Sequence, residues 1–159
     1  MTYEIKQADD SQLSIVHRVM REAFEEYQDR LFPQSGALRE EVEDIRKKIT
    51  DRGGAIIVWQ HEEPIGSAQY YFQGDYMYIG RVSVVRSARG RGIGTAIMQN
   101  LEQVAMKRNV FETRIGARKS LPNNISYYQN IGFEILEEHE YPEKTDGWFV
   151  MKKCLKSNQ

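Results

Sequence analysis

The sequence predicts a single α+β domain built on a mixed, mostly antiparallel sheet. Three observations carry this prediction: helical periodicity in the N-terminal third, three consecutive strand-like segments within residues 55–85, and alternating helix and strand patterns after residue 93. Consecutive strands favour an antiparallel meander, whereas strands that alternate with helices favour crossover connections. Because the chain contains neither a repeat nor a long linker, residues 1–159 are expected to form one domain.

The N-terminal third is expected to contain a short strand and two amphipathic helices. Residues 2–7 alternate weakly between polar and apolar side chains, as in a strand with one buried face. Apolar side chains then recur at helical spacing over residues 13–31, which predicts the first helix. Pro33 and Gly36 interrupt that pattern, and a second apolar stripe over residues 38–49 predicts the second helix.

The rest of the chain is expected to supply most of the sheet. β-Branched and aromatic residues mark the strands, and a return of the helical period marks two further helices. The predicted strands cover residues 55–59, 65–72, 76–85, 110–117, 133–139 and 148–154, and the predicted helices cover residues 93–105 and 124–131. The complete prediction is a central sheet of about seven strands flanked by about four helices.

Composition and charge exclude several classes of partner. With 40% hydrophobic and 28% charged residues, the chain has the composition of an ordinary globular protein. No segment reaches the roughly 18 consecutive apolar residues of a membrane-spanning helix. The 22 basic residues are balanced by 23 acidic residues, so no overall field attracts nucleic acid or anionic lipid. Neither nucleic acid nor a membrane is therefore expected as a partner.

The cysteine and the histidines indicate no metal site. Cys154 is the single cysteine, so it cannot form an intrachain disulfide, and this favours a reducing compartment. His17, His61 and His139 lie in different predicted elements and lack the spacing of metal ligands. The N-terminus has no signal-peptide pattern. A cytoplasmic protein without a bound metal is therefore expected.

Three alternating glycines, Gly90, Gly92 and Gly94, join a predicted strand to a predicted helix. Backbone N–H groups and the positive end of the helix converge at such a turn, and glycine has no Cβ to keep a phosphate away. The segment is therefore interpreted as a pyrophosphate site. The alternative is a structural glycine turn whose neighbouring arginines are only solvated.

A dinucleotide fold also places glycines after a strand, but its fingerprint fits poorly here. The third glycine of that fingerprint would fall on Thr95, and the next predicted strand ends in Arg118 and Lys119 rather than in an acid. Because a basic pair suits a 2′-phosphate, a dinucleotide-dependent oxidoreductase remains an alternative. The Walker pattern fails, since no Gly-Lys-Ser/Thr follows the glycines.

Two motifs resemble the GNAT superfamily of N-acetyltransferases. Arg89-x-x-Gly92-x-Gly94 resembles the acyl-CoA-binding signature of that family, and the segment from Asn124 to Phe133 resembles its downstream motif. The order of predicted elements is similar over nearly the whole chain. The resemblance implies transfer of an acetyl group from acetyl-CoA to a primary amine by direct attack, in a ternary complex. A non-catalytic acyl-CoA-binding sensor is the alternative.

The resemblance also implies positions for acetyl-CoA. The backbone of Val82 and Val84 would pair with the pantetheine arm, and the N–H of Val84 or Val85 would face the thioester carbonyl as an oxyanion donor. Asn124 would touch the pantetheine or the adenine side of the cofactor, unless it serves only as a helix N-cap. The pyrophosphate would be held by Arg89, Gly90, Arg91, Gly92, Gly94 and Thr95.

For catalysis, the resemblance implies that Tyr128 protonates the leaving thiolate, with Tyr127 as the competing assignment. The general base is harder to assign, because residues 76–85 contain neither Glu nor His. Glu26, on the first predicted helix, is the expected end point for the amine proton through ordered water. A solvated position on the helix surface is the alternative for Glu26.

The acceptor is expected to be a small-molecule or protein amine. Arg81 suggests an acceptor that also carries a carboxylate or phosphate, unless this arginine is paired internally. The acidic segment 137–146 suggests the opposite preference, for a cationic amine, unless it only solvates a turn. Both preferences, and a homodimeric state, are left open.

Overall fold

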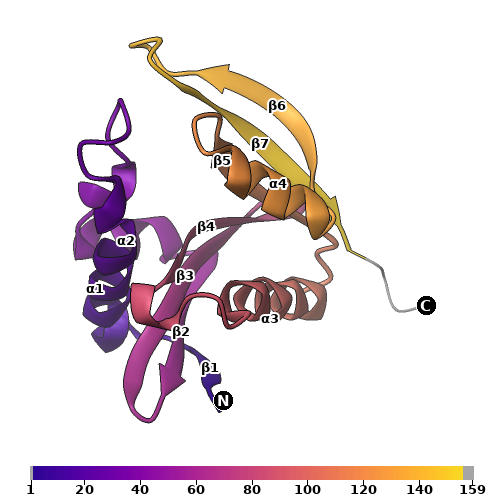
Figure 1. The fold of residues 1–159 in the computed structure, drawn as a ribbon. Coiled ribbons are helices and arrows are strands. Elements are labelled where there is room, and N and C mark those ends of the chain that lie inside the picture. The colour runs from indigo at the N-terminus through magenta and orange to yellow at the C-terminus, as the bar shows by residue number, and fades with distance from the viewer. Residues whose placement is uncertain (1, 156–159) are drawn as a thin grey trace.

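A computed structural model describes residues 2–155 and confirms the predicted fold class, a seven-stranded sheet with four α-helices (Figure 1). The strands are β1 (Glu4–Gln7), β2 (Gly53–Gln60), β3 (Glu63–Gln73), β4 (Tyr76–Val84), β5 (Glu112–Arg118), β6 (Glu134–Glu140) and β7 (Gly147–Cys154). The helices are α1 (Leu13–Phe24), α2 (Val42–Ile49), α3 (Ile93–Lys107) and α4 (Pro122–Asn130).

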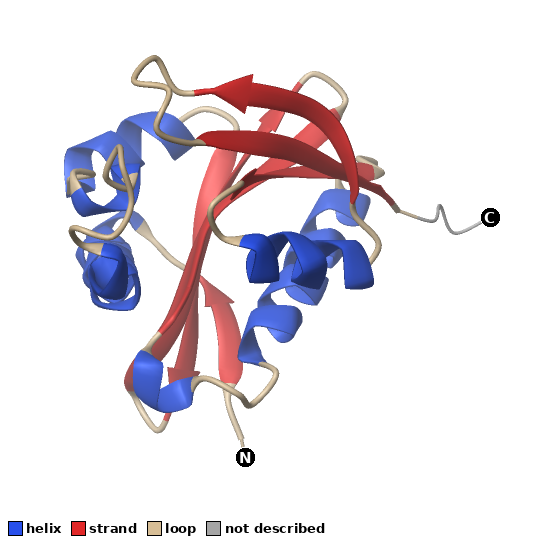
Figure 2. Ribbon diagram, turned by 45° about the horizontal axis from the view of Figure 1, so that its top comes forward, coloured by secondary structure: helices blue, strands red, loops and turns tan. Residues whose placement is uncertain are grey.

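The sheet has the order β1-β2-β3-β4-β5-β7-β6, and its pairs are antiparallel except for β4 with β5. α1 and α2 cover one face, and α3 and α4 cover the other (Figure 2). Because both faces are covered, β2 is apolar on both sides. Its Ile56 and Val58 join the larger core with α3, whereas Ala55 and Ile57 join a second core with α1 and α2.

Helical spacing of apolar residues explains how each layer packs on the sheet. In α3, Ile97, Leu101 and Ala105 recur on one face and are fully buried. In α1, Val16 and Met20 do the same on the opposite side of the sheet. Burial of each large apolar side chain stabilises the fold by about 1.5–3 kcal/mol. The two helical layers therefore hold the sheet from both sides.

β4 and β5 separate soon after they pair. Their parallel register contains two pairs, Met77 with Thr113 and Tyr78 with Arg114. Beyond Tyr78, side chains of both strands line one cavity instead of facing each other across a ladder. This divergence opens the sheet near its centre and leaves backbone groups of β4 turned toward the opening.

β4 also carries a bulge where it leaves β5. In its pairing with β3, Ser67 lies opposite Ser83 and Gln69 lies opposite Gly80, so β4 contains one additional residue. Within this segment Arg81 has a φ of 54°, a left-handed conformation that non-glycine residues rarely adopt. Bulges change the direction of a strand and of its side chains, often beside a functional site.

Two helix boundaries differ from the prediction. The first α-helix ends at Phe24 and continues as a 3-10 turn at Glu25–Tyr27, before Asp29, with a φ of 62°, breaks the helical path. Leu31 is buried but lies in the following loop, so its helical spacing did not reflect a helix. Leu38 belongs to a separate 3-10 turn that precedes α2.

The described residues contain neither a membrane-spanning helix nor a cluster of metal-ligating side chains. Within residues 2–155, no helix is both long and apolar enough to cross a membrane. In the same part of the chain, no three or more His, Cys, Asp or Glu side chains are grouped in a way that would hold a metal ion.

Candidate active site

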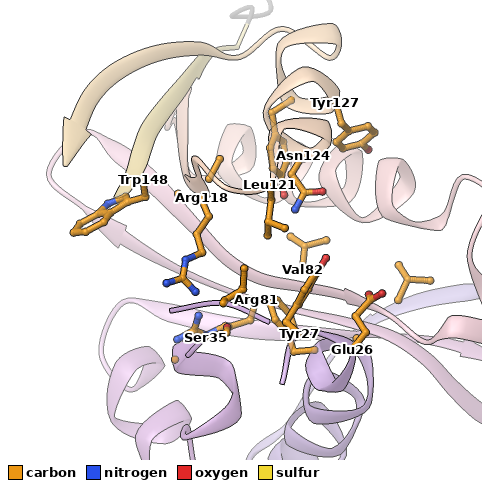
Figure 3. A pocket seen from close by; sticks show the side chains of 18 of the residues that line it. Glu26, Tyr27, Ser35, Arg81, Val82, Arg118, Leu121, Asn124, Tyr127 and Trp148 are labelled. Carbon is orange, nitrogen blue, oxygen red and sulfur yellow. The ribbon is translucent and has the colours of Figure 1, made fainter. Parts of the chain in front are cut away.

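A cleft opens where β4 and β5 diverge (Figure 3). Its cavity has a volume of about 720 Å³ and lies between the end of α1 with its following loop on one side and α4 on the other. Residues 89–95 adjoin one end, which we call the glycine end. The opposite end, which we call the arginine end, contains Arg81, Arg118 and Trp148. Tyr141 packs against Arg118 and Trp148, and the Tyr78 hydroxyl lies beside Gly116, so both tyrosines belong to the same end.

The glycine end presents backbone groups rather than side chains. Gly90 and Gly92 have φ values of 78° and 77°, which side-chain-bearing residues rarely adopt. A Cβ at Gly90, Gly92 or Gly94 would meet no atom within 4 Å, so the space in front of the turn is open. α3 begins at Ile93 without a side-chain cap, so the N–H groups of its first turn point outward at the positive end of the helix. This arrangement fits a pyrophosphate.

Arg89 ties the glycine end to two other elements. Its Nε donates to the carbonyl oxygen of Val84 at 3.1 Å, and its Nη2 donates to that of Ala23 at 3.0 Å. Its Nη1 lies 2.6 Å from Oε1 of Glu26. One side chain therefore connects the end of β4 with α1 and with the turn that follows it. This differs from a merely solvated arginine, and contact of Arg89 with pyrophosphate stays a prediction.

Glu26 lies on the wall of the cleft rather than on a solvated helix surface (Figure 3). Its side chain is 22% exposed, and the Arg89 ion pair turns its carboxylate toward the glycine end. The neighbouring Glu25 is not part of the cleft wall. The position of Glu26 is compatible with the predicted role as base, which stays a prediction.

Backbone hydrogen bonding at the end of β4 distinguishes the two candidate oxyanion donors, the N–H groups of Val84 and Val85. The N–H of Val85 donates to the carbonyl oxygen of Ile65 at 3.0 Å. Because this N–H is already bonded within the sheet, the prediction that Val85 could be the oxyanion donor is corrected. Successive residues of a strand direct their N–H and C=O groups to opposite sides. Val84 therefore directs both groups away from β3, as its bond from Arg89 shows for the carbonyl. Val82 and Val84 both line the cleft.

α4 brings Asn124 and two tyrosines to the cleft (Figure 3). The helix begins at Pro122, so Asn124 lies inside its first turn, and the N-cap alternative for Asn124 is wrong. The hydroxyl of Tyr127 lies 2.6 Å from Oγ1 of Thr95, which joins α4 to the first turn of α3. Asn124 is therefore free of a capping role and faces the cleft.

Tyr128 combines a place on the cleft wall with a raised pKa. Its ring packs edge-to-face on Phe133, with 5.6 Å between the centroids. Desolvation by burial, followed by the neighbouring Tyr127, Tyr78 and Tyr27, raises the pKa of the Tyr128 hydroxyl to about 12. The hydroxyl is therefore protonated at neutral pH, as a general acid must be.

At the arginine end, Arg81 is paired internally. Its Nη2 donates to Oε2 of Glu40 at 3.2 Å, and Nζ of Lys48 donates to the same oxygen at 3.0 Å. Gln69 Nε2 donates to the other carboxylate oxygen at 3.1 Å. Burial raises the pKa of Glu40, but Arg81, Lys48 and Gln69 together lower this pKa below its ordinary value. Two cations thus share one carboxylate.

The other residues of the arginine end were not assigned to the site from sequence. Arg118 Nε lies 3.1 Å from Oδ2 of Asp146, and the guanidinium lies 4.6 Å from the centroid of the Tyr141 ring. The Trp148 ring packs against Tyr141 at 4.7 Å between centroids. Tyr78 lines the cavity at the point where β4 and β5 stop pairing. These residues lie on separate segments, so no local motif marks them.

The acidic segment 137–146 has local partners for several of its carboxylates. Such pairing weakens the attraction that the segment could exert on a cationic acceptor. The contacts join Glu137 to His139, Glu138 to Lys119, and Asp146 to Arg118.

A family comparison agrees with the fold and the cleft. A sequence profile described as the Acetyltransferase (GNAT) family matches residues 15–133. The chain therefore belongs to the GNAT acetyltransferase family. A curated relative, "Uncharacterized N-acetyltransferase YjcF" of Bacillus subtilis (strain 168), is 24% identical over 108 residues, which cover 68% of this chain and 72% of the relative.

Solved structures share the fold at low sequence identity. The ribosomal-protein-S18-alanine N-acetyltransferase of Escherichia coli has a TM-score of 0.80 and 14% identity, over 99% of this chain and 97% of that chain. The PaiA N-acetyltransferase of Thermoplasma acidophilum, solved with coenzyme A, has a TM-score of 0.78 and 17% identity, over 97% of this chain and 99% of that chain. Among the described strands, β4 and β5 form the one parallel pair, which differs from a doubly wound dinucleotide fold.

Proposed function

We propose that this protein transfers an acetyl group from acetyl-CoA to a primary amine, with both substrates bound in the cleft at the same time. The observation that carries the proposal is the open, uncapped glycine end at one end of a cleft whose wall includes Tyr128. Membership of the GNAT acetyltransferase family supports the reaction class. When bound, acetyl-CoA supplies an acyl group that is activated as a thioester.

The glycine end is proposed to hold the pyrophosphate through the backbone from Gly90 to Thr95. An anion there meets outward-pointing N–H groups and the positive end of α3, without a Cβ in the way. The backbone of Val82 and Val84 would lie along the pantetheine arm, and Asn124 would reach it from α4, since all three residues line the cleft. Arg91 adds positive charge beside the turn.

The N–H of Val84 is the proposed oxyanion donor. It points away from β3, toward the opening between β4 and β5, whereas the N–H of Val85 is bonded to Ile65. A backbone donor fixed in this way stabilises negative charge on a carbonyl oxygen without reorganising during the reaction. The bulge beside Arg81 helps to hold this part of β4 apart from β5.

Proton transfers complete the proposed mechanism. A primary alkylamine with a pKa near 10 is almost fully protonated at pH 7, so it must lose a proton before or during attack. Glu26 is proposed to accept that proton through ordered water. Tyr128 is proposed to donate its proton to the sulfur as the carbon–sulfur bond breaks and the carbon–nitrogen bond forms. The nitrogen loses its second proton to water as the amide forms, Tyr128 regains a proton from water, and Glu26 releases the proton that it accepted. The products are an amide, a free thiol and one net proton.

Two measurements on the full chain test the proposal. In a thermal-shift assay, acetyl-CoA should raise the unfolding temperature, whereas NADPH should not. In a second assay, release of free CoA thiol should require an amine from a panel of amino acids, polyamines and peptides. Stabilisation without thiol release from any amine would favour the non-catalytic sensor, and no stabilisation by acetyl-CoA would refute the proposal.

A further inference from the structure

Arg118 is a buried cation whose guanidinium donors are only partly satisfied within the described residues. It ends β5, and its side chain is about one-tenth exposed. Nε faces Asp146 at 3.1 Å, and Nη2 donates to the carbonyl oxygen of Pro33 at 2.5 Å. Nε and Nη1 are both buried and make no hydrogen bond among residues 2–155, and of these two only Nε has a printed ion-pair contact, with Asp146. Because a buried N–H without a partner is unfavourable, Nη1 marks a position where an acceptor group is missing.

The surroundings of Arg118 identify the charge of that missing group. The charged residues on the cleft wall are three arginines, Arg81, Arg89 and Arg118, and one acid, Glu26. Glu26 faces Arg89 at the glycine end, so the arginine end carries no unshared carboxylate among its described residues. Arg81 also shares its carboxylate partner with a lysine. The arginine end therefore favours an anion and disfavours a polycation.

The shape of the same region indicates what carries the anion. Tyr141 and Trp148 lie together, and Arg118 lies over the Tyr141 ring. Tyr78 and Tyr27 also line the cavity, and Figure 3 shows Tyr27 on the side of Glu26. Aromatic walls of this kind bind flat apolar groups by area burial and offset stacking.

We propose that the acceptor is an amine that carries a carboxylate and a flat apolar body, as an aromatic amino acid does, and that Nη1 of Arg118 binds the carboxylate. This inference rests on the proposed acetyl transfer and names its substrate class. It also replaces Arg81, which is paired with Glu40, by Arg118 as the anion-binding arginine. A charge-assisted hydrogen bond from a guanidinium to a carboxylate is among the stronger polar contacts.

A second role of Arg118 is structural, and the test must separate the two. Its contacts with Asp146 and Pro33 connect the loop between β6 and β7 to the loop between α1 and α2. Loss of that connection would lower turnover of every acceptor alike. Loss of carboxylate binding would lower turnover only of acceptors that carry a carboxylate.

L-Phenylalanine and 2-phenylethylamine are matched probes, because they share the ring and the amine and differ in the carboxylate. We expect kcat/KM of wild-type protein to be about 10- to 100-fold higher for L-phenylalanine, and spermidine to be the poorest of the three. In Arg118→Gln, the ratio of kcat/KM for the two probes should fall toward one. Arg118→Lys, which keeps the charge but not the fork of donors, should recover part of the ratio.

Arg114→Gln is the matched control. Arg114 lies four residues before Arg118 on β5. It faces Glu112 at 2.5 Å and covers the Tyr76 ring at 3.8 Å, but it does not line the cleft. The control should keep the wild-type ratio. An unchanged ratio in Arg118→Gln, or an equal loss for both probes, would overturn the proposal.

A binding measurement keeps the two proposals distinguishable. In the presence of CoA, L-phenylalanine should raise the unfolding temperature of wild-type protein more than 2-phenylethylamine does. If acetyl-CoA stabilises the protein but the two probes have equal effects, the carboxylate inference is wrong and the acetyl-CoA site stands. If Arg118→Gln does not fold, the wild-type comparison of the two probes alone decides the matter.

Discussion

The glycine end and the arginine end of the cleft are built in different ways. At the glycine end, consecutive residues 89–95 supply backbone N–H groups, and the absence of side chains creates the space. At the arginine end, side chains from β4, β5 and β7 come together, and some of them contact loops that are far away along the chain. Arg118, for example, donates to a carbonyl 85 residues distant. The first end depends on local sequence, and the second depends on tertiary packing.

This difference predicts that the two ends respond differently to substitution. Backbone binding at the glycine end fails when a side chain enters the space, whatever the acceptor. Side-chain binding at the arginine end can be altered one group at a time, so acceptor choice can change without loss of acetyl-CoA binding.

The largest effect is expected at the glycine end. Gly94→Asp should reduce acetyl-CoA affinity by at least about 100-fold, because it places a negative charge in the open space where phosphate is proposed to bind. Gly94 has no left-handed φ, so the change adds no backbone strain. Calorimetric titration with acetyl-CoA measures the effect.

Gly74→Asp is the control for this experiment. Gly74 has a φ of 55° and open space around it, but it lies in the turn between β3 and β4. It should bind acetyl-CoA like the wild type. Equal affinities in folded Gly94→Asp and wild-type protein would show that the phosphate is bound elsewhere.

The second effect concerns stability at the arginine end. Glu40→Gln should lower the free energy of unfolding by about 3 kcal/mol, because Arg81 and Lys48 would lose their shared buried carboxylate. The pKa of Glu40 in the folded state lies below its ordinary value of 4.5, so its stabilising contribution is present above that pH and is lost as the pH falls through the folded-state pKa. Denaturant titration from about pH 7 down to about pH 3, a range that includes the ordinary value of 4.5, should show wild type and variant converging only at the acidic end.

Glu43→Gln is a suitable comparison, because Glu43 is paired with Arg46 on the exposed surface of α2. Its effect should be below about 1 kcal/mol. If Glu40→Gln is no more destabilising than Glu43→Gln, the buried cluster does not stabilise the arginine end.

The third effect concerns catalysis between the two ends. Tyr128→Phe should lower kcat by about 10²-fold and leave acetyl-CoA affinity near normal. Because the pKa of Tyr128 is raised to about 12, its protonated form persists as the pH rises, and wild-type kcat should show no loss from this group up to about pH 10. Steady-state kinetics across pH measures both quantities.

Tyr127→Phe serves as the paired variant, since Tyr127 contacts Thr95 instead. It should retain most of kcat. If Tyr127→Phe lost most of its kcat while Tyr128→Phe stayed fully active, Tyr127 rather than Tyr128 would be the general acid.

The smallest effect is expected for Glu26. Glu26→Gln should lower kcat/KM by about tenfold, at the low end of acid–base contributions, and should change the pH profile. Its ion pair with Arg89 would weaken as well, so acetyl-CoA affinity is measured in parallel. Glu25→Gln, on the same turn but outside the cleft wall, is the control. A wild-type rate and pH profile in Glu26→Gln would exclude Glu26 as the base.

The same contrast explains what the sequence could predict. The order of strands and helices followed from periodicity, and the glycine turn followed from three glycines at a strand-to-helix junction. Both are local patterns. The end of the first helix was misjudged, because Leu31 keeps helical spacing while Asp29 turns the chain. A left-handed residue that is not glycine leaves little trace in a sequence.

The arginine end could not be predicted for a physical reason. Arg118 appeared only as part of a basic pair at the end of a strand, and its aromatic partner Tyr141 lies in the acidic segment 137–146, which was interpreted by its charge alone. Arg81 was singled out, but its pairing with Glu40 depends on how the loop before α2 lies beside the bulge of β4. Such contacts join residues whose sequence separation carries no pattern.

Two-substrate kinetics tests the central claim most directly, namely that one cleft holds acetyl-CoA at the glycine end and an amine at the arginine end together. Initial rates of thiol release are measured with both substrates varied, with an amine that the panel shows to be turned over. Direct attack in a ternary complex predicts double-reciprocal lines that intersect. Parallel lines, which indicate a ping-pong mechanism with a covalent acetyl-enzyme, would contradict the account.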